Sequence, residues 1–140
     1  MEIGYTTGVF DLFHVGHLNV LRRAASECDL LIVGVTDCET VKKYKGYYPI
    51  IPLEERLEII SELKCVDKVV VQTSMDKYLA WKELKYNKLF HGDDWQGSDM
   101  YNQMELKLKN LGVQVIYFPY TKGTSTSLLK ERVYEQYNKG

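Results

Sequence analysis

Cysteine and proline are both scarce in this sequence, with three residues of each among 140. Cys28, Cys38 and Cys65 are odd in number and show no C-x-x-C spacing, which argues against a disulfide framework and against a zinc site. No apolar run approaches the roughly 20 residues that span a bilayer, and the first residues lack the order of a secretory signal. We therefore expect a protein of the reducing cytoplasm that has no membrane partner.

A surplus of charge of either sign is also missing. The chain has 18 Lys and Arg against 19 Asp and Glu, which gives a net charge of −1 at pH 7. A balanced chain has no general attraction for nucleic acid, so we expect no nucleic-acid partner. Any site for an anion must then be built locally.

What is present is the composition of a globular chain, 45% hydrophobic and 26% charged, and its length fits one domain over residues 1–140. Apolar runs rich in β-forming residues alternate with segments of helical periodicity. The predicted strands are residues 3–7, 30–35, 69–71, 88–90 and 113–118. Strands separated by helix-length segments pair in parallel through right-handed crossovers. We therefore expect an α/β fold with an open, doubly wound, five-stranded parallel sheet.

Two stretches, residues 37–52 and 92–101, show no clear periodicity and are rich in glycine, tyrosine and charge. Doubly wound sheets bind their ligands at the carboxyl ends of the strands. We expect both stretches to be loops at that edge.

The first predicted strand ends at Gly8 and leads through a short loop into an apolar-periodic helix. Free backbone N–H groups and the positive end of the helix dipole meet at such a junction, which makes it a natural phosphate site. His14 and His17 are three residues apart and can face the same side of the first helical turn, while Gly16 lets a ligand approach the backbone. The alternative is that His14 caps or packs against the helix and that His17 simply lies in it.

The run G-V-F-D-L-F-H-V-G-H at residues 8–17 resembles the signature of the cytidylyltransferases, a branch of the H-x-G-H nucleotidyltransferase superfamily. Residues 92–95, G-D-D-W, and residues 123–127, G-T-S-T-S, stand where small bacterial glycerol-3-phosphate cytidylyltransferases carry G-D-D-W and R-T-E-G-I-S-T-T. The resemblance extends from residue 3 to about residue 133. It implies a Rossmann-like fold, a homodimer, and transfer of a cytidylyl group from CTP, with Mg²⁺, to an alcohol phosphate. The implied acceptor is sn-glycerol 3-phosphate, and the products are CDP-glycerol and pyrophosphate.

The predicted helix of residues 52–64 carries Arg56 and Lys64 on its apolar face, while its glutamates crowd the opposite side. A buried guanidinium is costly unless an anion meets it. That anion can be a structural carboxylate such as Asp11 or Asp67, or a substrate phosphate; alternatively, the arginine reaches outward from the helix end. The resemblance favours phosphate, and it places Lys64 where the bacterial enzymes usually have arginine.

Lysines 42, 43 and 45 follow the second predicted strand and can close over a triphosphate, although solvated loop lysines are common. Lys43 and Lys45 resemble a paired lysine position of the family. Asp93 and Asp94 follow a short strand directly, where they can accept hydrogen bonds, help to hold magnesium, or simply cap a turn.

The hydroxyl residues 124–126 precede a predicted helix and can form a cap or a second anion site. This segment departs from the family, because Tyr120 stands in place of an arginine and Lys122 in place of a glutamate. A lysine ammonium does not reproduce the two parallel hydrogen bonds of a guanidinium. We therefore expect Tyr120 and Lys122 to change the hydrogen bonds that hold the triphosphate or the acceptor.

These residues form three predicted groups. The candidate catalytic residues are His14, His17, Lys43 and Lys45. The candidate nucleotide-binding residues are Thr7, Gly8, Val9, Phe10, Asp11, Gly16, Asp93, Lys122, Gly123, Thr124, Ser125 and Thr126. The candidate acceptor-phosphate residues are Arg56, Lys64, Asp94 and Trp95. We expect Mg²⁺ to be bound mainly through the CTP phosphates and not by a protein cage.

Three other functions remain open at this point. The acceptor can be another small alcohol phosphate, or the chain can be an adenylyltransferase of the same superfamily. From a different class, it can be a nucleotide sensor that binds CTP without turnover. Release of pyrophosphate separates an enzyme from a sensor.

Overall fold

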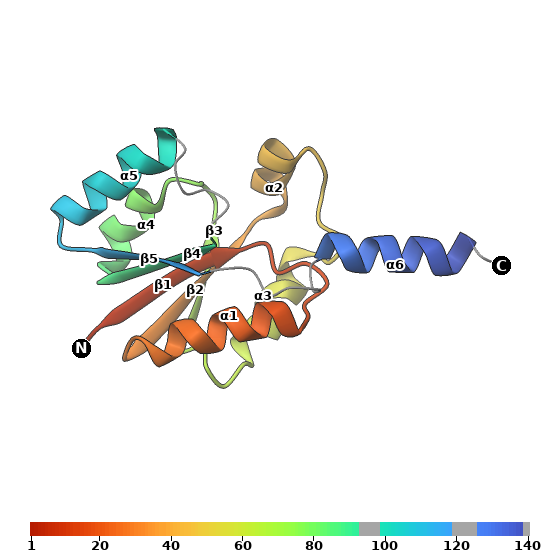
Figure 1. Cartoon of the computed structure of the whole chain (residues 1–140), viewed down its shortest axis with the longest axis horizontal. Coiled ribbons are helices and arrows are strands. Elements are labelled where there is room, and N and C mark those ends of the chain that lie inside the picture. Colours follow the sequence, from red (N-terminus) through yellow and green to blue (C-terminus); the bar gives the residue numbers. More distant parts are fainter. Residues whose placement is uncertain (93–98, 119–125, 139–140) are drawn as a thin grey trace.

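The structure, a computed structural model, describes residues 1–92, 99–118 and 126–138. It contains a five-stranded parallel sheet with helices on both faces (Figure 1). The strands are β1 Ile3–Gly8, β2 Leu30–Thr36, β3 Lys68–Gln72, β4 Lys88–Gly92 and β5 Gln114–Phe118. The helices are α1 Val15–Ser26, α2 Cys38–Lys45, α3 Leu53–Ser61, α4 Lys77–Leu84, α5 Asp99–Asn110 and α6 Thr126–Asn138. The predicted fold class is confirmed, and each predicted strand is found within two residues of its expected bounds.

One face of the sheet packs against α1 and α3. Leu31, Val33 and Val35 alternate along β2 and are fully buried in a cluster with Leu21 of α1 and Ile60 of α3. Side chains two residues apart lie on the same face of a strand, which is why this alternation makes a continuous apolar surface. Each such side chain contributes roughly 1.5–3 kcal/mol by leaving water.

The opposite face packs against α4 and α5. Tyr5 of β1 and Ile32 of β2 are buried there with Leu108 of α5, and Trp81 of α4 packs at the margin. The stacked rings of Tyr5 and Tyr86, 5.0 Å apart, fill the centre of this layer. Both faces of β1 and β2 are therefore covered, as expected for inner strands of a parallel sheet.

The strand order β3-β2-β1-β4-β5 reverses at β1, which pairs with β2 on one side and β4 on the other. The chain leaves β1 through α1 on one face and leaves β4 toward α5 on the other face (Figure 1). The connections after these two strands diverge, and such a switch point opens a crevice at the carboxyl edge.

The expectation that residues 37–52 form a loop is wrong over its first half, which is the helix α2. Asp37 begins this helix by accepting a hydrogen bond from the Thr40 amide at 2.8 Å, and Gly46 ends it in the left-handed conformation with φ of 84°. In the second stretch, residues 99–101 begin α5, and residues 93–98 lie outside the described residues.

The last helix, α6, begins beside the loop that follows β1 and extends away from the body of the molecule (Figure 1). Its second half is exposed along its whole length, including Val133, Tyr134 and Tyr137. Within the described ranges, no helix is long and apolar enough to cross a bilayer.

Candidate functional site

A pocket of about 520 Å³ lies at the carboxyl edge of the sheet, where the strand order reverses. We call it the carboxyl-edge pocket. Its walls come from the end of β1, the first turn of α1, parts of α2 and α4, the end of β4 and the first turn of α6. Ten predicted site residues line it: Thr7, Gly8, Val9, Phe10, Asp11, His14, Gly16, His17, Lys45 and Thr126.

His14 and His17 are stacked on each other at the start of α1, with ring centroids 4.0 Å apart. The Nδ1 atom of His14 accepts a hydrogen bond from the Gly16 amide at 3.0 Å, and Nδ1 of His17 accepts one from the His14 amide at 3.2 Å. These two bonds form a reciprocal cap of the helix N-terminus. The prediction that the two rings lie on the same side of the first helical turn is confirmed. The alternative prediction, that His14 caps the helix, is confirmed as well.

The cap fixes the protonation of both rings. An Nδ1 atom that accepts a hydrogen bond carries no proton, so each neutral ring must carry its proton on Nε2. Burial lowers the pKa of His17 to about 4, with His14 and Lys45 adding to the effect, and burial also lowers the pKa of His14. At neutral pH the pair therefore offers two neutral Nε2–H donors. The Nε2 atom of His14 has no partner among the described residues.

Asp11 holds the loop that precedes these histidines. Its carboxylate oxygens accept hydrogen bonds from the amides of Ile50 and Ile51, each at 2.9 Å, and its side chain is 5% exposed. Phe10 and Leu12, its neighbours, have φ of 54° and 49°, a left-handed conformation that costs non-glycine residues energy. The two amide contacts of Asp11 help to hold this conformation, and they join the loop to the segment that precedes α3.

Arg56 points inward as predicted, but its partners are not anions. Its Nε donates to the carbonyl of Ile51 at 2.9 Å, and Nη1 donates to the carbonyls of Val9 at 2.9 Å and Thr36 at 2.7 Å. Neither Asp11 nor Asp67 meets the guanidinium; Asp67 accepts from the Leu31 amide instead. Arg56 is 1% exposed and does not line the carboxyl-edge pocket. The prediction that Arg56 meets an anion is therefore wrong, because its guanidinium donates to three backbone carbonyl oxygens. These hydrogen bonds give Arg56 a structural role beside the pocket.

The predicted inward direction of Lys64 is wrong. The helix α3 ends at Ser61, so the helical count does not extend to Lys64, which is exposed. Lys64 lies in the connection that leads into β3. In a parallel sheet the strands begin at the edge opposite to the carboxyl-edge pocket. Lys64 therefore cannot join the acceptor site that we predicted for it.

The three lysines of α2 occupy different places. Lys45 lines the carboxyl-edge pocket, whereas the Nζ atom of Lys42 donates to the carbonyl of Gly46 at 2.8 Å. Lys43 is exposed, with Nζ 5.5 Å from the centre of the Tyr44 ring, and it does not line the pocket. The structure thus brings one of the two predicted catalytic lysines to the site.

The segment around α6 is only partly described. Thr126 donates from Oγ1 to the carbonyl of Asp11 at 2.9 Å, and Nζ of Lys130 lies 3.8 Å from the Asp11 carboxylate. These contacts bring the start of α6 to the loop that follows β1. The other predicted binding residues near this helix or after β4 lie outside the described residues, and so does Tyr120. These predicted residues are Asp93, Asp94, Trp95, Lys122, Gly123, Thr124 and Ser125.

Sequence reasoning missed a buried polar network at the floor of the pocket. The Nζ atom of Lys77 donates to Thr7 Oγ1 at 2.8 Å and to Gln72 Oε1 at 2.5 Å, and Gln72 Nε2 donates to Thr36 Oγ1 at 2.8 Å. His91, at the end of β4, lines the same pocket. Gln72 and His91 lie at the carboxyl ends of strands, where ligands bind in such sheets, so that rule could have indicated them. No local sequence pattern indicates that Lys77 is buried in the pocket.

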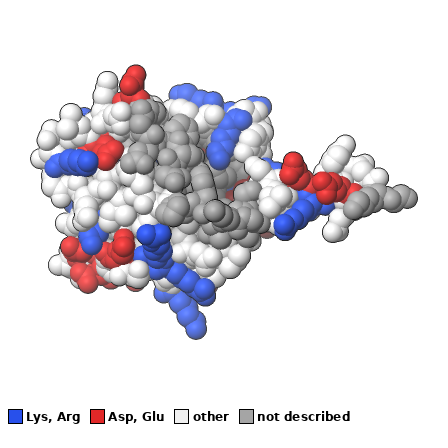
Figure 2. All heavy atoms as spheres, viewed as in Figure 1, with Lys and Arg blue, Asp and Glu red and all other residues white. Residues whose placement is uncertain are grey.

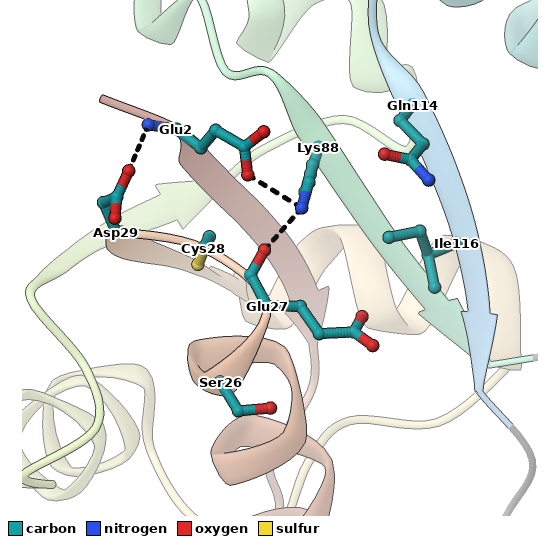
Figure 3. A pocket seen from close by; sticks show the side chains of 8 residues that line it. All are labelled: Glu2, Ser26, Glu27, Cys28, Asp29, Lys88, Gln114 and Ile116. Atoms are coloured by element: carbon teal, nitrogen blue, oxygen red, sulfur yellow. Dashed lines mark hydrogen bonds and ion pairs between the residues drawn. The ribbon is translucent and has the colours of Figure 1, made fainter.

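A second hollow, of about 580 Å³, lies at the amino ends of the strands (Figure 3). Its lysine, Lys88, points to Glu2 and Glu27 and is already paired, with Nζ 2.8 Å from the Glu2 carboxylate and 2.6 Å from the Glu27 carbonyl. The two hollows have similar volumes, so volume alone does not show which of them is the candidate site. The carboxyl-edge pocket holds unpaired donors and a helix N-terminus, and it is therefore the candidate site.

Charged side chains of both signs are visible on the face of the molecule that Figure 2 draws. In the view of Figure 2, blue and red side chains are both scattered over the body, and α6 carries both kinds. The described residues contain no group of three or more His, Cys, Asp or Glu that could hold a metal ion. The groups that a ligand in this pocket would meet are the described side chains and backbone groups that line it.

Comparisons with known proteins agree with this geometry. The family model described as cytidylyltransferase-like matches residues 5–132. A protein named FAD synthase from Pyrococcus horikoshii is 39% identical over 137 residues, which cover 91% of this chain and 89% of that protein. An FAD synthase from Pyrococcus abyssi is 42% identical over 116 residues, covering 81% and 77%. The bifunctional protein HldE from Helicobacter hepaticus is 33% identical over 94% of this chain, which spans only 26% of that protein.

Solved structures show the same fold. The lipopolysaccharide core biosynthesis protein from Thermoplasma volcanium has a TM-score of 0.76 and 28% identity, and the match covers 87% of this chain and 99% of that one. A pantoate–β-alanine ligase from Francisella tularensis has a TM-score of 0.63 at 18% identity, covering 86% and 60%, a likeness in fold alone.

Replacing Arg56 by methionine should lower the free energy of unfolding by about 2–4 kcal/mol, because three buried carbonyl oxygens lose a charged donor. Urea denaturation measures this effect. Glu55→Met, an exposed neighbour on the same helix, is the control and should change stability little. If Arg56→Met were as stable as the wild type and only weakened substrate binding, the role given to Arg56 here would be wrong.

Lowering the pH should destabilise the fold through its histidines. An unfolded histidine titrates near pH 6.5, whereas burial lowers the pKa of folded His17 to about 4 and that of His91 to about 3. Between these values the unfolded chain binds more protons, so the free energy of unfolding should fall as the pH drops below about 6.5. His17→Asn keeps an acceptor for the His14 amide and should make this fall shallower, as measured by urea denaturation between pH 7.5 and 5. Equal slopes in both proteins would count against the assigned protonation.

Proposed function

Because the chain belongs to the cytidylyltransferase-like family, we propose that it transfers the cytidylyl group of CTP to a small alcohol phosphate, sn-glycerol 3-phosphate, releasing CDP-glycerol and pyrophosphate. The observation that carries this proposal is the pair of Nε2–H donors at the N-terminus of α1, inside the carboxyl-edge pocket. Together with the positive end of the helix dipole, they suit the oxygens of a polyphosphate.

In this reaction a phosphate oxygen of the acceptor attacks the α-phosphorus of CTP. The new P–O bond forms as the bond to the β-phosphate breaks, and pyrophosphate leaves with the electron pair. The attacking oxygen is already anionic at neutral pH, so no general base and no covalent nucleophile are needed. The protein must align the two substrates and stabilise the charge that develops on the phosphates.

The residues of the pocket fit these tasks. His14 and His17 donate hydrogen bonds without carrying a charge that would hold the product pyrophosphate. Lys45, at the pocket rim, supplies a positive charge for the departing phosphates. Because the described residues offer no cluster of metal ligands, we expect Mg²⁺ to arrive with the triphosphate, where it neutralises part of the phosphate charge.

A second candidate, adenylyl transfer to a flavin phosphate, is favoured by two observations. Relatives named FAD synthase are 39% and 42% identical to this chain, and FAD is the adenylylated form of flavin mononucleotide. Two tyrosines, Tyr44 and Tyr47, line the pocket with 48% and 45% of their surfaces exposed, and their rings could stack on a planar acceptor.

A matrix of nucleotides and acceptors separates these candidates. Each of CTP, ATP, GTP and UTP is offered with sn-glycerol 3-phosphate, other alcohol phosphates and flavin mononucleotide, and pyrophosphate release is measured. We expect the highest kcat/KM for CTP with sn-glycerol 3-phosphate. Preference for ATP with flavin mononucleotide would establish the second candidate instead. Binding of CTP without pyrophosphate release from any pair would indicate a sensor.

His17→Ala should lower kcat by about 10²- to 10³-fold, because it removes one preorganised donor to the transferring phosphate. Circular dichroism and urea denaturation check that the variant remains folded. Asn19→Ala, an exposed position two residues along the same helix, is the matched control and should keep normal turnover. Near-normal turnover of His17→Ala would refute the role of this ring.

A further inference from the structure

Lys130, in the second turn of α6, lines the carboxyl-edge pocket with a loosely held ammonium group. Its side chain is 31% exposed, and its Nζ atom lies 3.8 Å from the Asp11 carboxylate and 4.5 Å from the centre of the Tyr47 ring. The distance to Asp11 is longer than a hydrogen bond. An ammonium has three N–H donors, so this group can still donate to a ligand.

Asp11 does not need Lys130 as a partner. Its two carboxylate oxygens already accept hydrogen bonds from the amides of Ile50 and Ile51, each at 2.9 Å. Its backbone carbonyl accepts from Thr126 Oγ1, which holds the start of α6 in place. A partly exposed ion pair of this length is weak. Lys130 can therefore leave Asp11 for a more highly charged anion while the loop and the helix stay where they are.

The ammonium of Lys130 is on the same part of the pocket wall as the histidine pair. Asp11 precedes His14 by three residues in the loop after β1. It is close enough to His17 to act on that ring: burial lowers the pKa of His17 to about 4, and the negative charge of Asp11 opposes the change. A cation beside Asp11 is thus also near the place that we propose for the triphosphate.

The neutral histidines leave the charge of a triphosphate to be offset by lysines. A nucleoside triphosphate carries about four negative charges at neutral pH, and a bound Mg²⁺ offsets about two of them. Lys77 is held by Thr7 and Gln72 on the opposite side of β1, and Lys45 is exposed at the rim. The described lysines and arginines that line the pocket are Lys45, Lys77 and Lys130. Lys45 and Lys130 together match the remaining charge.

We propose that Lys130 binds the outer phosphates of the nucleotide, leaving Asp11 when the triphosphate enters and donating hydrogen bonds from Nζ to β- or γ-phosphate oxygens. This inference rests on the proposed nucleotidyl transfer, in which His17 donates to the phosphate that is transferred. The long, flexible side chain of lysine allows the ammonium to move while Thr126 keeps the helix in place. In the free protein, Asp11 and Tyr47 hold the ammonium beside the pocket.

The first test measures nucleotide binding without an acceptor, by isothermal titration calorimetry with CTP and with CMP. Lys130→Met should raise the Kd for CTP by about 10-fold or more but that for CMP by less than about twofold, because CMP lacks the outer phosphates. Lys130→Arg keeps the charge and should bind CTP within about threefold of the wild type. Arg132→Met, which removes an exposed cation of the same helix, is the matched control and should leave both Kd values unchanged.

Equal weakening of CTP and CMP binding would mean that Lys130 acts only by shaping the pocket through Asp11, and it would overturn the inference. An unchanged Kd for CTP in Lys130→Met would overturn it as well. ATP and AMP are measured in the same way, so that a preference for adenine still tests Lys130. Binding of neither triphosphate would remove both this inference and the proposed function.

The second test separates ligand binding from a structural role. Without nucleotide, Lys130→Met should unfold in urea at nearly the same midpoint as the wild type, because Asp11 keeps its two amide donors. Saturating CTP stabilises a protein that binds it, and this upward shift of the midpoint should be smaller in Lys130→Met. A lower midpoint without CTP, together with an undiminished shift on adding it, would show that Lys130 is structural and not a ligand to phosphate.

The same variants distinguish this inference from the function on which it rests. Binding of CTP that depends on Lys130, in a protein that releases no pyrophosphate with any acceptor, would support the inference and remove the proposed reaction. Turnover of CTP whose KM does not depend on Lys130 would support the reaction and remove the inference.

Discussion

The burial of one guanidinium is the constraint on which the geometry of the site depends. Arg56 reaches from α3 and donates hydrogen bonds to carbonyl groups in the loop after β1, at the end of β2 and in the segment before α3. Asp11 adds a second link between the first loop and the segment before α3. Because a buried guanidinium must keep its acceptors, the three segments are fixed relative to one another, and the first loop is fixed with them.

The site that results works with uncharged donors on one side and a cation on the other. His14 and His17 use their Nδ1 atoms to cap α1, which leaves their Nε2–H groups outside the cap, and burial lowers the pKa of both rings. Lys77 is held by neutral oxygens on the far side of β1. The donors that line the carboxyl-edge pocket thus differ in charge on the two sides of β1.

Local patterns predicted much of this arrangement. The strands follow from apolar runs such as residues 30–35, and the inward direction of Arg56 follows from its place on the apolar face of α3. The partners of Arg56 could not be predicted, because Val9 and Thr36 are 47 and 20 residues away and only the sheet brings them together. Lys64 was misplaced because the helical count was carried past Ser61, where α3 ends. The helix α2 was missed because its stabilising features are the caps at Asp37 and Gly46, while its side chains are mostly polar.

The side-chain hydroxyl of Thr6 donates to the carbonyl of Phe90, which lies 84 residues further along the chain. Parallel pairing of β1 with β4 therefore brings together two strands that are far apart in the sequence. The chain loses conformational entropy before these contacts form, which makes such pairing slow. During synthesis, the first ninety residues can collapse without presenting a working site. The carboxyl-edge pocket takes one of its walls from the end of β4, so it is completed only when this distant strand joins the sheet.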